Sequence, residues 1–228
     1  MPEGASVVRH RFEPGAHDGT VPGMRRQHEH STSVQEHQVS VMNNTKKSYI
    51  ITYTGKQFNL LEPETTSIDI IDIAHSLAMQ CRWTGHCKHH YSIAQHAYYC
   101  SFIGPTNSAL QRLMHDSSEA YLGDMNRPLK HYTEAGDAYR RVEWPIQNLI
   151  YTSYGMPKQE AASVGLADQA MLYAEQAQLL PPVTFEISDP EAKSKAANVF
   201  IEEWTPRSAE KMFMTRFIEL YLNKGRTN

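Results

Sequence analysis

The amino-acid sequence predicts an all-α fold with a short β element before the first helix. Apolar residues recur at the three- and four-residue spacing of helices through most of the chain after residue 66. One β-branched stretch, residues 48–58, alternates instead, which is typical of a strand or hairpin. The chain has 228 residues and no internal repeat, so it can form one domain with a core and an additional tail.

The first part of the chain, residues 1–47, is polar, rich in Gly, His, Ser and Gln, and has no hydrophobic period. Such a segment cannot bury enough apolar surface to offset the entropy lost on ordering. We therefore predict a disordered N-terminal extension over residues 1–47 and one domain over residues 48–228. Composition favours a solvated leader over an adventitious metal-binding tail, although five of the twelve histidines lie here: His10, His17, His28, His30 and His37.

The β element and the first helix follow. Residues 48–58 alternate before a turn at Thr54-Gly55, and we expect this hairpin to lie on a helical body. Thr66 or Ser67 is expected to cap the next segment, a helix whose apolar face is formed by Ile68, Ile71, Ala74, Leu77 and Ala78. His75 falls within this helix, where a packing role is favoured over metal ligation.

Apolar periodicity and Gly or Pro ends predict the remaining helices: residues 91–102, 107–122, 135–154, 158–179 and 208–222. The helix over 107–122 would carry His115 and Asp116 without interruption. Pro145 is expected to bend the helix that contains it. Residues 127–130 are interpreted as a kinked loop, and residues 183–205 as irregular.

Charge, cysteine count and hydropathy restrict the class of protein. A net charge of -3 argues against a general nucleic-acid-binding or anionic-membrane surface, so any phosphate recognition must be local. The three cysteines, Cys81, Cys87 and Cys100, form no C-x-x-C pair, which favours a reducing compartment and argues against a disulfide framework or zinc ribbon. No apolar run of membrane-spanning length and no leader-like start are present. We expect a soluble, cytoplasmic protein without nucleic-acid or membrane partners.

A polar cluster in an otherwise apolar helical region indicates chemistry. His115 and Asp116 are adjacent, and Glu119 follows one helical turn later. Side chains three and four residues apart share a helix face, so these three can converge. Further ligands for a shared ion are available from two other helical runs, His96 upstream and Asp168 downstream. Nitrogen and oxygen donors of this kind suit divalent transition metals or Mg²⁺.

In this order the four side chains form an H…HD…D pattern, and the chain resembles the HD-domain metal-dependent phosphohydrolases. The resemblance covers about residues 48–180 and is strongest to the branch that contains bacterial 5'-deoxynucleotidases and nucleoside-triphosphate-hydrolysing relatives. It extends to four further segments: Thr54–Phe58, Asp72–His75, Cys81–His86 and Glu119–Lys130. Each His or Asp alone is more often a satisfied buried polar group, but four in family order argue for a metal site.

The resemblance implies an HD-domain helical fold and an enzyme with a divalent metal ion (Co, Mn, Zn, Fe or Mg) held by His96, His115, Asp116 and Asp168. Two histidines and two carboxylates leave coordination positions open, as a catalytic site requires. The expected function is hydrolysis of a phosphate ester of a (deoxy)nucleotide by metal-activated water, as in a 5'-deoxynucleotidase. A homo-oligomeric state is left open.

The remaining site residues have expected roles. Glu119 would orient or deprotonate the attacking water, or pass a proton to the leaving oxygen. Arg82 and Lys130 would bind phosphate and stabilise its developing charge. The resemblance implies that Trp83 and Asp124 contribute to recognition of deoxyribose, Trp83 through its face and Asp124 by accepting a hydroxyl hydrogen bond or acting at the leaving group.

Two alternatives remain open. A dNTP triphosphohydrolase or pyrophosphohydrolase would need extra cationic groups for the longer phosphate tail, for which the candidates are Lys88, Arg127, Lys130, Arg140 and Arg141. A metal-bound nucleotide sensor without catalysis is the second alternative. The presence of Glu119 and Arg82 argues against it, because a binding protein has less need of a water-activating carboxylate.

Overall fold

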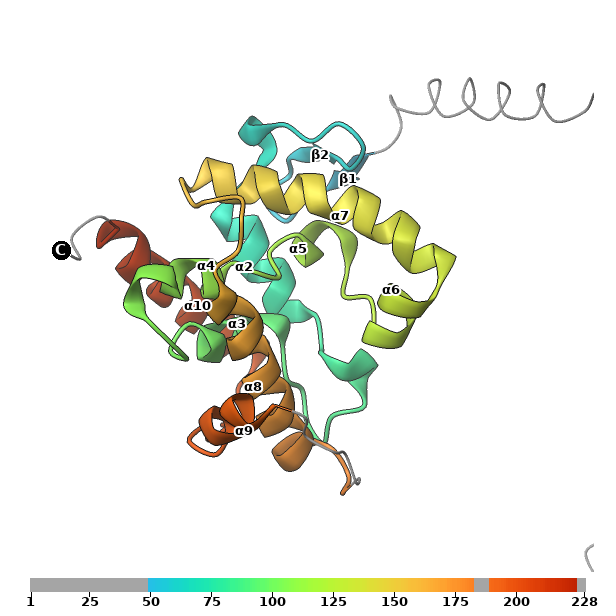
Figure 1. Cartoon of the computed structure of the whole chain (residues 1–228). Helices are drawn as coiled ribbons and strands as arrows, with labels where there is room; N and C mark the ends of the chain where they lie inside the picture. Colours follow the sequence, from blue (N-terminus) through green and yellow to red (C-terminus); the bar gives the residue numbers. More distant parts are fainter. Residues whose placement is uncertain (1–48, 183–188, 225–228) are drawn as a thin grey trace, which may run out of the picture. The chain divides into compact units, whose positions relative to one another are not determined.

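A computed structural model describes residues 49–182 and 189–224 of the chain (Figure 1). The chain divides into two units, Met1–Met42 and Asn43–Asn228, and every described residue belongs to the second. The predicted disordered extension over residues 1–47 lies outside the described residues. Helices dominate the described part, with one two-stranded sheet, so the all-α prediction with a short N-terminal β element is confirmed.

The sheet is an antiparallel hairpin of β1 (Tyr49–Ile51) and β2 (Gln57–Asn59). Its turn contains Gly55 in the left-handed region, with φ of 85°, which glycine adopts without steric cost. Phe58 is fully buried and stacks on Tyr121 with ring centroids 3.8 Å apart. This contact fixes the hairpin to the helical body, and the prediction for residues 48–58 is confirmed.

Helix α2 (Ile70–Met79) is the first long element of the helical body. Its cap is Asp69, whose side chain accepts a hydrogen bond from the Ile71 amide, so the predicted cap at Thr66 or Ser67 is wrong. Those two residues instead belong to a separate 3-10 turn, η2 (Thr65–Ser67), after which the backbone becomes extended. His75 stacks on Tyr53 and lies 3.1 Å from a carboxylate oxygen of Glu210, which confirms its packing role.

Helix α3 (Ile93–Cys100) is capped by Ser92 and lies within the predicted range 91–102. The predicted continuous helix over 107–122 is wrong: the structure has η4 (Thr106–Ser108), α4 (Ala109–Leu113) and α5 (Glu119–Leu122), with a turn between α4 and α5. The buried Gln147 side chain stabilises the break. Its amide nitrogen donates to the Met114 carbonyl oxygen, and its oxygen accepts from the Ser118 amide.

Residues 127–130, predicted as a kinked loop, are part of helix α6 (Arg127–Tyr132). The Asn126 side chain caps it, and Pro128 lies in the first turn, where proline is compatible with a helix. Helix α7 (Glu134–Ser153) continues through Pro145, and α8 (Ala162–Leu179) follows. The region predicted as irregular contains α9 (Pro190–Ala196), while α10 (Pro206–Leu222) confirms the last predicted helix.

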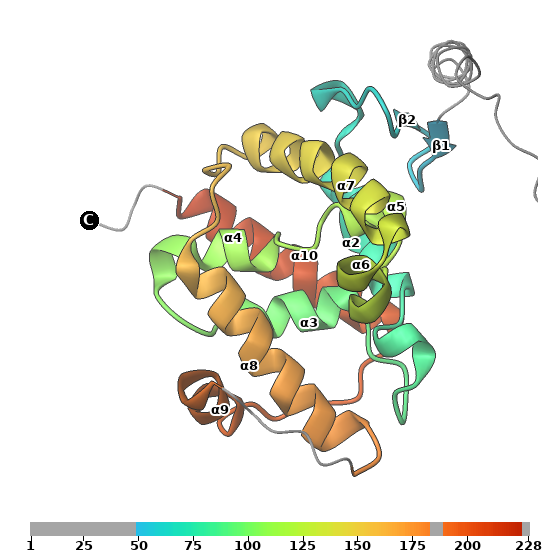
Figure 2. The same cartoon turned by 45° about the vertical axis from the view of Figure 1, so that its right-hand side comes forward.

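Two clusters of buried apolar side chains form the core. One joins α2, α4, α7 and α10, and the other joins α8 and α9. Helix α3 contributes to both, with Ala94 and Ala97 in the first and Cys100 in the second. Figure 2 shows α3 running beside α8 and α10, which it contacts. Within the described residues, no helix combines the length and the apolar character needed to cross a bilayer.

Candidate metal centre

Four side chains from three regions of the fold converge on one point. His96 comes from α3, His115 and Asp116 from the turn between α4 and α5, and Asp168 from α8. Nε2 of His96 lies 3.4 Å from Nε2 of His115, 3.7 Å from Oδ2 of Asp116 and 3.3 Å from Oδ1 of Asp168. Nε2 of His115 is 3.2 Å from Oδ2 of Asp116. The structure thus brings the four predicted ligands together.

Both imidazole rings are oriented by hydrogen bonds at their other nitrogen. Nδ1 of His115 lies 2.8 Å from the carbonyl oxygen of Arg112. Because a carbonyl oxygen only accepts, this nitrogen carries the proton and Nε2 keeps its lone pair. Nδ1 of His96 is 2.6 Å from Oε1 of Glu175, which is fully buried on α8. Metal-binding histidines are typically held in this way by a carbonyl or a carboxylate.

The spacing of the donors fits one divalent ion. Atoms that share an ion at about 2.0–2.2 Å lie roughly 3.0–3.6 Å from one another in octahedral or tetrahedral geometry. Three of the four distances between these donors, 3.2, 3.3 and 3.4 Å, fall in that range, and the fourth, 3.7 Å, lies just above it. A metal-binding histidine is neutral, so the two carboxylates would supply the charge that balances a divalent cation. Burial opposes charge on both aspartates, but His96 and His115 in their protonated forms, together with Arg82, hold the pKa of Asp116 and Asp168 below its ordinary value.

A thiol lies beside the same histidines. Sγ of Cys100 is 3.4 Å from Nε2 of His96, and His96, Cys100 and His115 form a group that can hold a metal ion. A thiol must lose its proton to bind a metal, and burial raises the pKa of Cys100. The carboxylates, whose pKa values are lowered, are therefore better prepared as ligands than Cys100.

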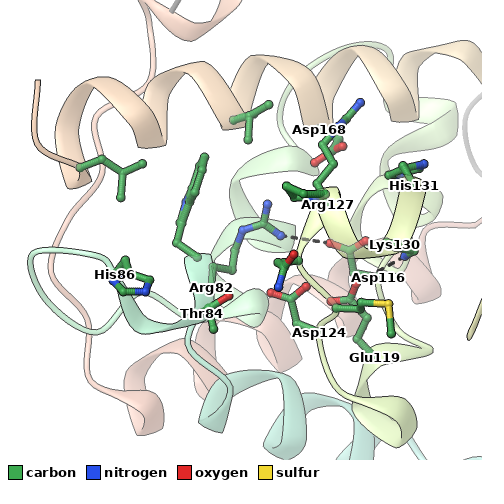
Figure 3. Close-up of a pocket in the computed structure, with 16 residues that line it drawn as sticks. Arg82, Thr84, His86, Asp116, Glu119, Asp124, Arg127, Lys130, His131 and Asp168 are labelled. Atoms are coloured by element: carbon green, nitrogen blue, oxygen red, sulfur yellow. Dashed lines mark hydrogen bonds and ion pairs between the residues drawn. The ribbon is translucent and has the colours of Figure 1, made fainter. Parts of the chain in front are cut away.

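A cavity of about 440 Å³ opens onto the centre (Figure 3). Asp116 and Asp168 lie in its wall, while His96 and His115 are not among the lining residues. Every predicted catalytic and substrate-binding residue lines it: Arg82, Trp83, Glu119, Asp124 and Lys130. Helix α6 adds Arg127 and His131 to the same wall. Residues almost ninety positions apart in the sequence, such as Arg82 and Asp168, thus line the same cavity.

Glu119 has the environment of an acid or base. Its side chain is nearly buried, Oε2 has no hydrogen-bond partner among the described residues, and Oε1 is 3.9 Å from Nζ of Lys130. Burial and the nearby Asp116 and Asp124 raise the pKa of Glu119 well above its ordinary value. Burial likewise raises the pKa of Asp124, whose backbone amide donates to the Gln80 side chain. Both carboxyls can therefore hold or release a proton nearer to neutral pH.

Two cationic residues of the cavity, Arg82 and Lys130, are paired within the protein. Arg82 lies 3.4 Å from Oδ2 of Asp116 through Nη1 and 3.3 Å from Oε2 of Glu175 through Nε. Nζ of Lys130 is 2.6 Å from Oε1 of Glu143 and lies over the Tyr139 ring. Glu143 thus offsets much of the positive charge that Lys130 brings to the cavity.

The backbone that presents Trp83 is strained. Trp83 and Thr84, within η3 (Trp83–Gly85), have φ of 58° and 52°, a region in which residues other than glycine are uncommon. Such conformations persist where surrounding contacts enforce them, and they cluster at functional sites. One such contact is the hydrogen bond of 3.0 Å from the Trp83 indole nitrogen to Oε2 of Glu175.

Sequence reasoning assigned no site role to Gln80, Glu143 or Glu175, which the structure places at or behind the site. Glu175 had a usable signal, because it lies seven residues after Asp168 and therefore two turns along the same face of a helix. Gln80 and Glu143 had none, because their partners lie elsewhere in the sequence.

The fold and the site define a mostly helical protein with a candidate divalent-metal centre beside a polar cavity. No family model matches the chain. It is 38% identical over 175 residues to the uncharacterized protein YfdR of Escherichia coli, covering 76% of this chain and 96% of YfdR. It is 30% identical over 121 residues to the uncharacterized protein RCAP_rcc00048 of Rhodobacter capsulatus, covering 49% of this chain and 61% of that protein. The chain belongs to the family of YfdR.

Proposed function

We propose that this protein is a divalent-metal-dependent phosphohydrolase that hydrolyses the phosphate ester of (deoxy)nucleotides, of the 5'-deoxynucleotidase type. The observation that carries the proposal is the convergence of His96, His115, Asp116 and Asp168 beside a cavity that also contains the buried Glu119. The order of these residues in the sequence resembles that of HD-domain phosphohydrolases, which supplies the reaction class.

The four ligand residues would hold the ion, with Co, Mn, Zn, Fe and Mg as candidates. When bound, such an ion acts as a Lewis acid toward a phosphoryl oxygen and lowers the pKa of water. Glu175 and the Arg112 carbonyl oxygen keep the two imidazoles oriented for this ligation. Glu119, whose pKa is raised, can accept a proton from the attacking water or donate one to the leaving oxygen.

The other cavity residues suit the rest of a nucleotide. Arg82 can stabilise charge on the phosphoryl oxygens from its position beside Asp116. The Trp83 ring lines the cavity and offers a face for a base or sugar, and Asp124 can accept a hydrogen bond from a sugar hydroxyl. A cavity of about 440 Å³ lies within the usual range for small-ligand sites.

A triphosphate substrate is the second candidate, and the basic residues of α6 are the observation in its favour. Of the five cationic candidates, only Arg127 and Lys130 line the cavity. Lys130 is already paired with Glu143. Lys88 donates to the Gln178 carbonyl oxygen, and Arg140 pairs with Asp137 and the Lys130 carbonyl oxygen. This arrangement supports a monophosphate over a longer phosphate tail.

The test uses the purified full chain, stripped with a chelator and reloaded with one metal at a time. Each form is given deoxynucleoside and ribonucleoside mono- and triphosphates, and the products phosphate, pyrophosphate and triphosphate are measured separately. We expect phosphate from deoxynucleoside monophosphates, lost on chelation and restored by metal. Release of pyrophosphate or triphosphate would establish the second candidate. Nucleotide binding without turnover under every metal would support the alternative of a metal-bound nucleotide sensor. Failure to bind metal would overturn the proposal.

A further inference from the structure

Glu175 accepts hydrogen bonds from both halves of the site. It is fully buried, and its Oε1 lies 2.6 Å from Nδ1 of the ligand residue His96. Its Oε2 lies 3.0 Å from Nε1 of Trp83 and 3.3 Å from Nε of Arg82. One carboxylate therefore contacts a metal ligand on one side and two cavity residues on the other.

The position of Glu175 on α8 explains how it reaches both. It lies seven residues after Asp168, two helical turns, and such residues differ by only about 20° around the helix axis. Helix α8 thus supplies a metal ligand directly through Asp168 and orients a second ligand through Glu175. A displacement of this helix would move both contributions together.

The charge state of Glu175 fits this role. The Arg82 guanidinium at Oε2 and the Nδ1–H of His96 at Oε1 both stabilise the carboxylate form. As a carboxylate it has acceptor capacity for all three donors, whereas an amide at the same place has one oxygen and one NH₂ group. A glutamine would accept from His96 and turn its NH₂ toward the N–H groups of Trp83 and Arg82, or the reverse. In either orientation, the NH₂ group of the glutamine would face an N–H group of at least one of these residues, so two donors would meet.

We propose that Glu175 is a positioning residue that couples the metal centre to the substrate-binding wall formed by Arg82 and Trp83. It fixes the His96 ring for ligation, and through the same carboxylate it holds the strained Trp83 backbone and the Arg82 guanidinium at the cavity. A change at the metal centre is therefore transmitted to this wall through one side chain. The inference deepens the proposed function and rests on it for the identity of the substrate.

The experiment compares the full chain with Glu175→Gln. Metal affinity is measured by competition with a chelator, using Zn²⁺ and Mn²⁺. The indole N–H signal of Trp83 is followed by NMR with ¹⁵N-labelled tryptophan, in which only three indole signals exist, and Trp83→Phe assigns it. We expect Glu175→Gln to weaken metal binding roughly 10–100-fold, the usual effect of removing a group that orients a ligand histidine. We also expect it to shift the Trp83 signal and not those of Trp144 and Trp204.

A control separates these effects from a general loss of stability. Thr54→Val removes the 2.9 Å hydrogen bond from the Thr54 hydroxyl to the buried Asp72, between the hairpin and α2 and away from the cavity lining. It should lower the melting temperature while leaving metal affinity and the Trp83 signal unchanged. Trp83→Phe should keep metal affinity, because it leaves the contact between Glu175 and His96 intact.

The unmodified protein gives a second measurement in case Glu175→Gln does not fold. Loading with Zn²⁺ should shift the Trp83 indole signal more than those of Trp144 and Trp204. Unchanged metal affinity in Glu175→Gln, an unmoved Trp83 signal in that variant, or a Zn²⁺ response not centred on Trp83 would each overturn the coupling. None of these measurements needs turnover, so absence of nucleotide hydrolysis would contradict the proposed function alone.

Discussion

Nη1 of Arg82 lies 3.4 Å from Oδ2 of Asp116, the same oxygen that faces Nε2 of His115 at 3.2 Å. A guanidinium and a candidate metal position therefore share one carboxylate oxygen. Arg82 also contacts Glu175, so it is held between two anionic groups of the site. Its position supports action on a phosphate that has reached the metal centre, because moving Arg82 out of the site would leave the buried Glu175 and the partly buried Asp116 without this cationic partner.

The substitution Arg82→Ala should keep the metal and lower kcat/KM toward a deoxynucleoside monophosphate by roughly 10²–10³-fold, the usual loss when a charge-stabilising group is removed. The four ligands remain, but the cation beside the reacting phosphate is lost. Elemental analysis and steady-state kinetics on the same sample provide both readouts. Arg82→Lys keeps the charge without the fork of donors and should recover only part of the loss. Metal loss in Arg82→Ala would show that Arg82 chiefly maintains the ligand geometry.

Asp116→Ala should release metal and abolish turnover together, because it removes an anionic ligand. Asp124→Asn is the matched control, since Asp124 lines the same cavity without contacting the two ligand histidines at the distances found for Asp116. Asp124→Asn should keep its metal content and change the KM for a deoxynucleotide. Metal content is measured by elemental analysis after dialysis. A metal-replete Asp116→Ala would remove this residue from the ligand set.

Glu119→Ala should keep the metal, because no contact within the described part of the chain places Glu119 beside the four candidate ligand atoms. Its turnover should fall by roughly 10²–10⁴-fold, the usual contribution of a positioned acid or base. Glu119→Gln tests the same point with less change of shape, because its side chain is nearly isosteric. The measurement is kcat with metal content on the same preparation. If either variant loses its metal, Glu119 is a ligand and the division of roles is incorrect.

Local sequence patterns were sufficient for much of this fold. The alternation of residues 48–58 predicted the hairpin, and apolar periodicity placed His96 and Asp168 inside helices that the structure contains. The resemblance to the H…HD…D order of HD-domain phosphohydrolases selected the four candidate ligands, His96, His115, Asp116 and Asp168, whose side chains the structure brings together. Convergence in the structure then followed from packing that the sequence does not display locally.

Long-range contacts account for what was missed. The break between α4 and α5 depends on Gln147, which is 29 residues from Ser118, and periodicity through 107–122 continues as if no break existed. Thr66 and Ser67 do not cap α2 because they belong to the separate turn η2, and an extended Ile68 then leaves Asp69 as the cap. The ion pair between Lys130 and Glu143 joins α6 to α7. The sequence does not display this pair, so it predicted a Lys130 charge available for phosphate.

The thiols provide a prediction independent of the proposed activity. Cys81, Cys87 and Cys100 are free. Burial raises the pKa of Cys87 to about 12 and raises that of Cys100, which is completely buried. Alkylation requires the thiolate, so iodoacetamide at pH 8 should label Cys81 before the other two, as read by peptide mass spectrometry. Cys87→Ser should leave metal content and turnover nearly unchanged. Rapid labelling of Cys87 in the folded protein would contradict the burial that raises its pKa.

The last prediction concerns the turn that carries His115 and Asp116. Gln147→Ala removes both hydrogen bonds that bridge the break: the Ser118 amide loses its partner, and the Met114 carbonyl oxygen keeps the Ser117 amide as a donor. Each buried group left unsatisfied costs roughly 1–3 kcal/mol, and each kcal/mol lowers the melting temperature of a chain this size by roughly 2–4 °C. We therefore expect a clear loss of melting temperature together with weaker metal binding, because the turn positions two ligands. Asn148→Ala is the matched control on the same helix, since its side-chain oxygen has no hydrogen-bond partner among the described residues. If Gln147→Ala lost stability but kept full metal affinity, the turn would be maintained by its other contacts and not by Gln147.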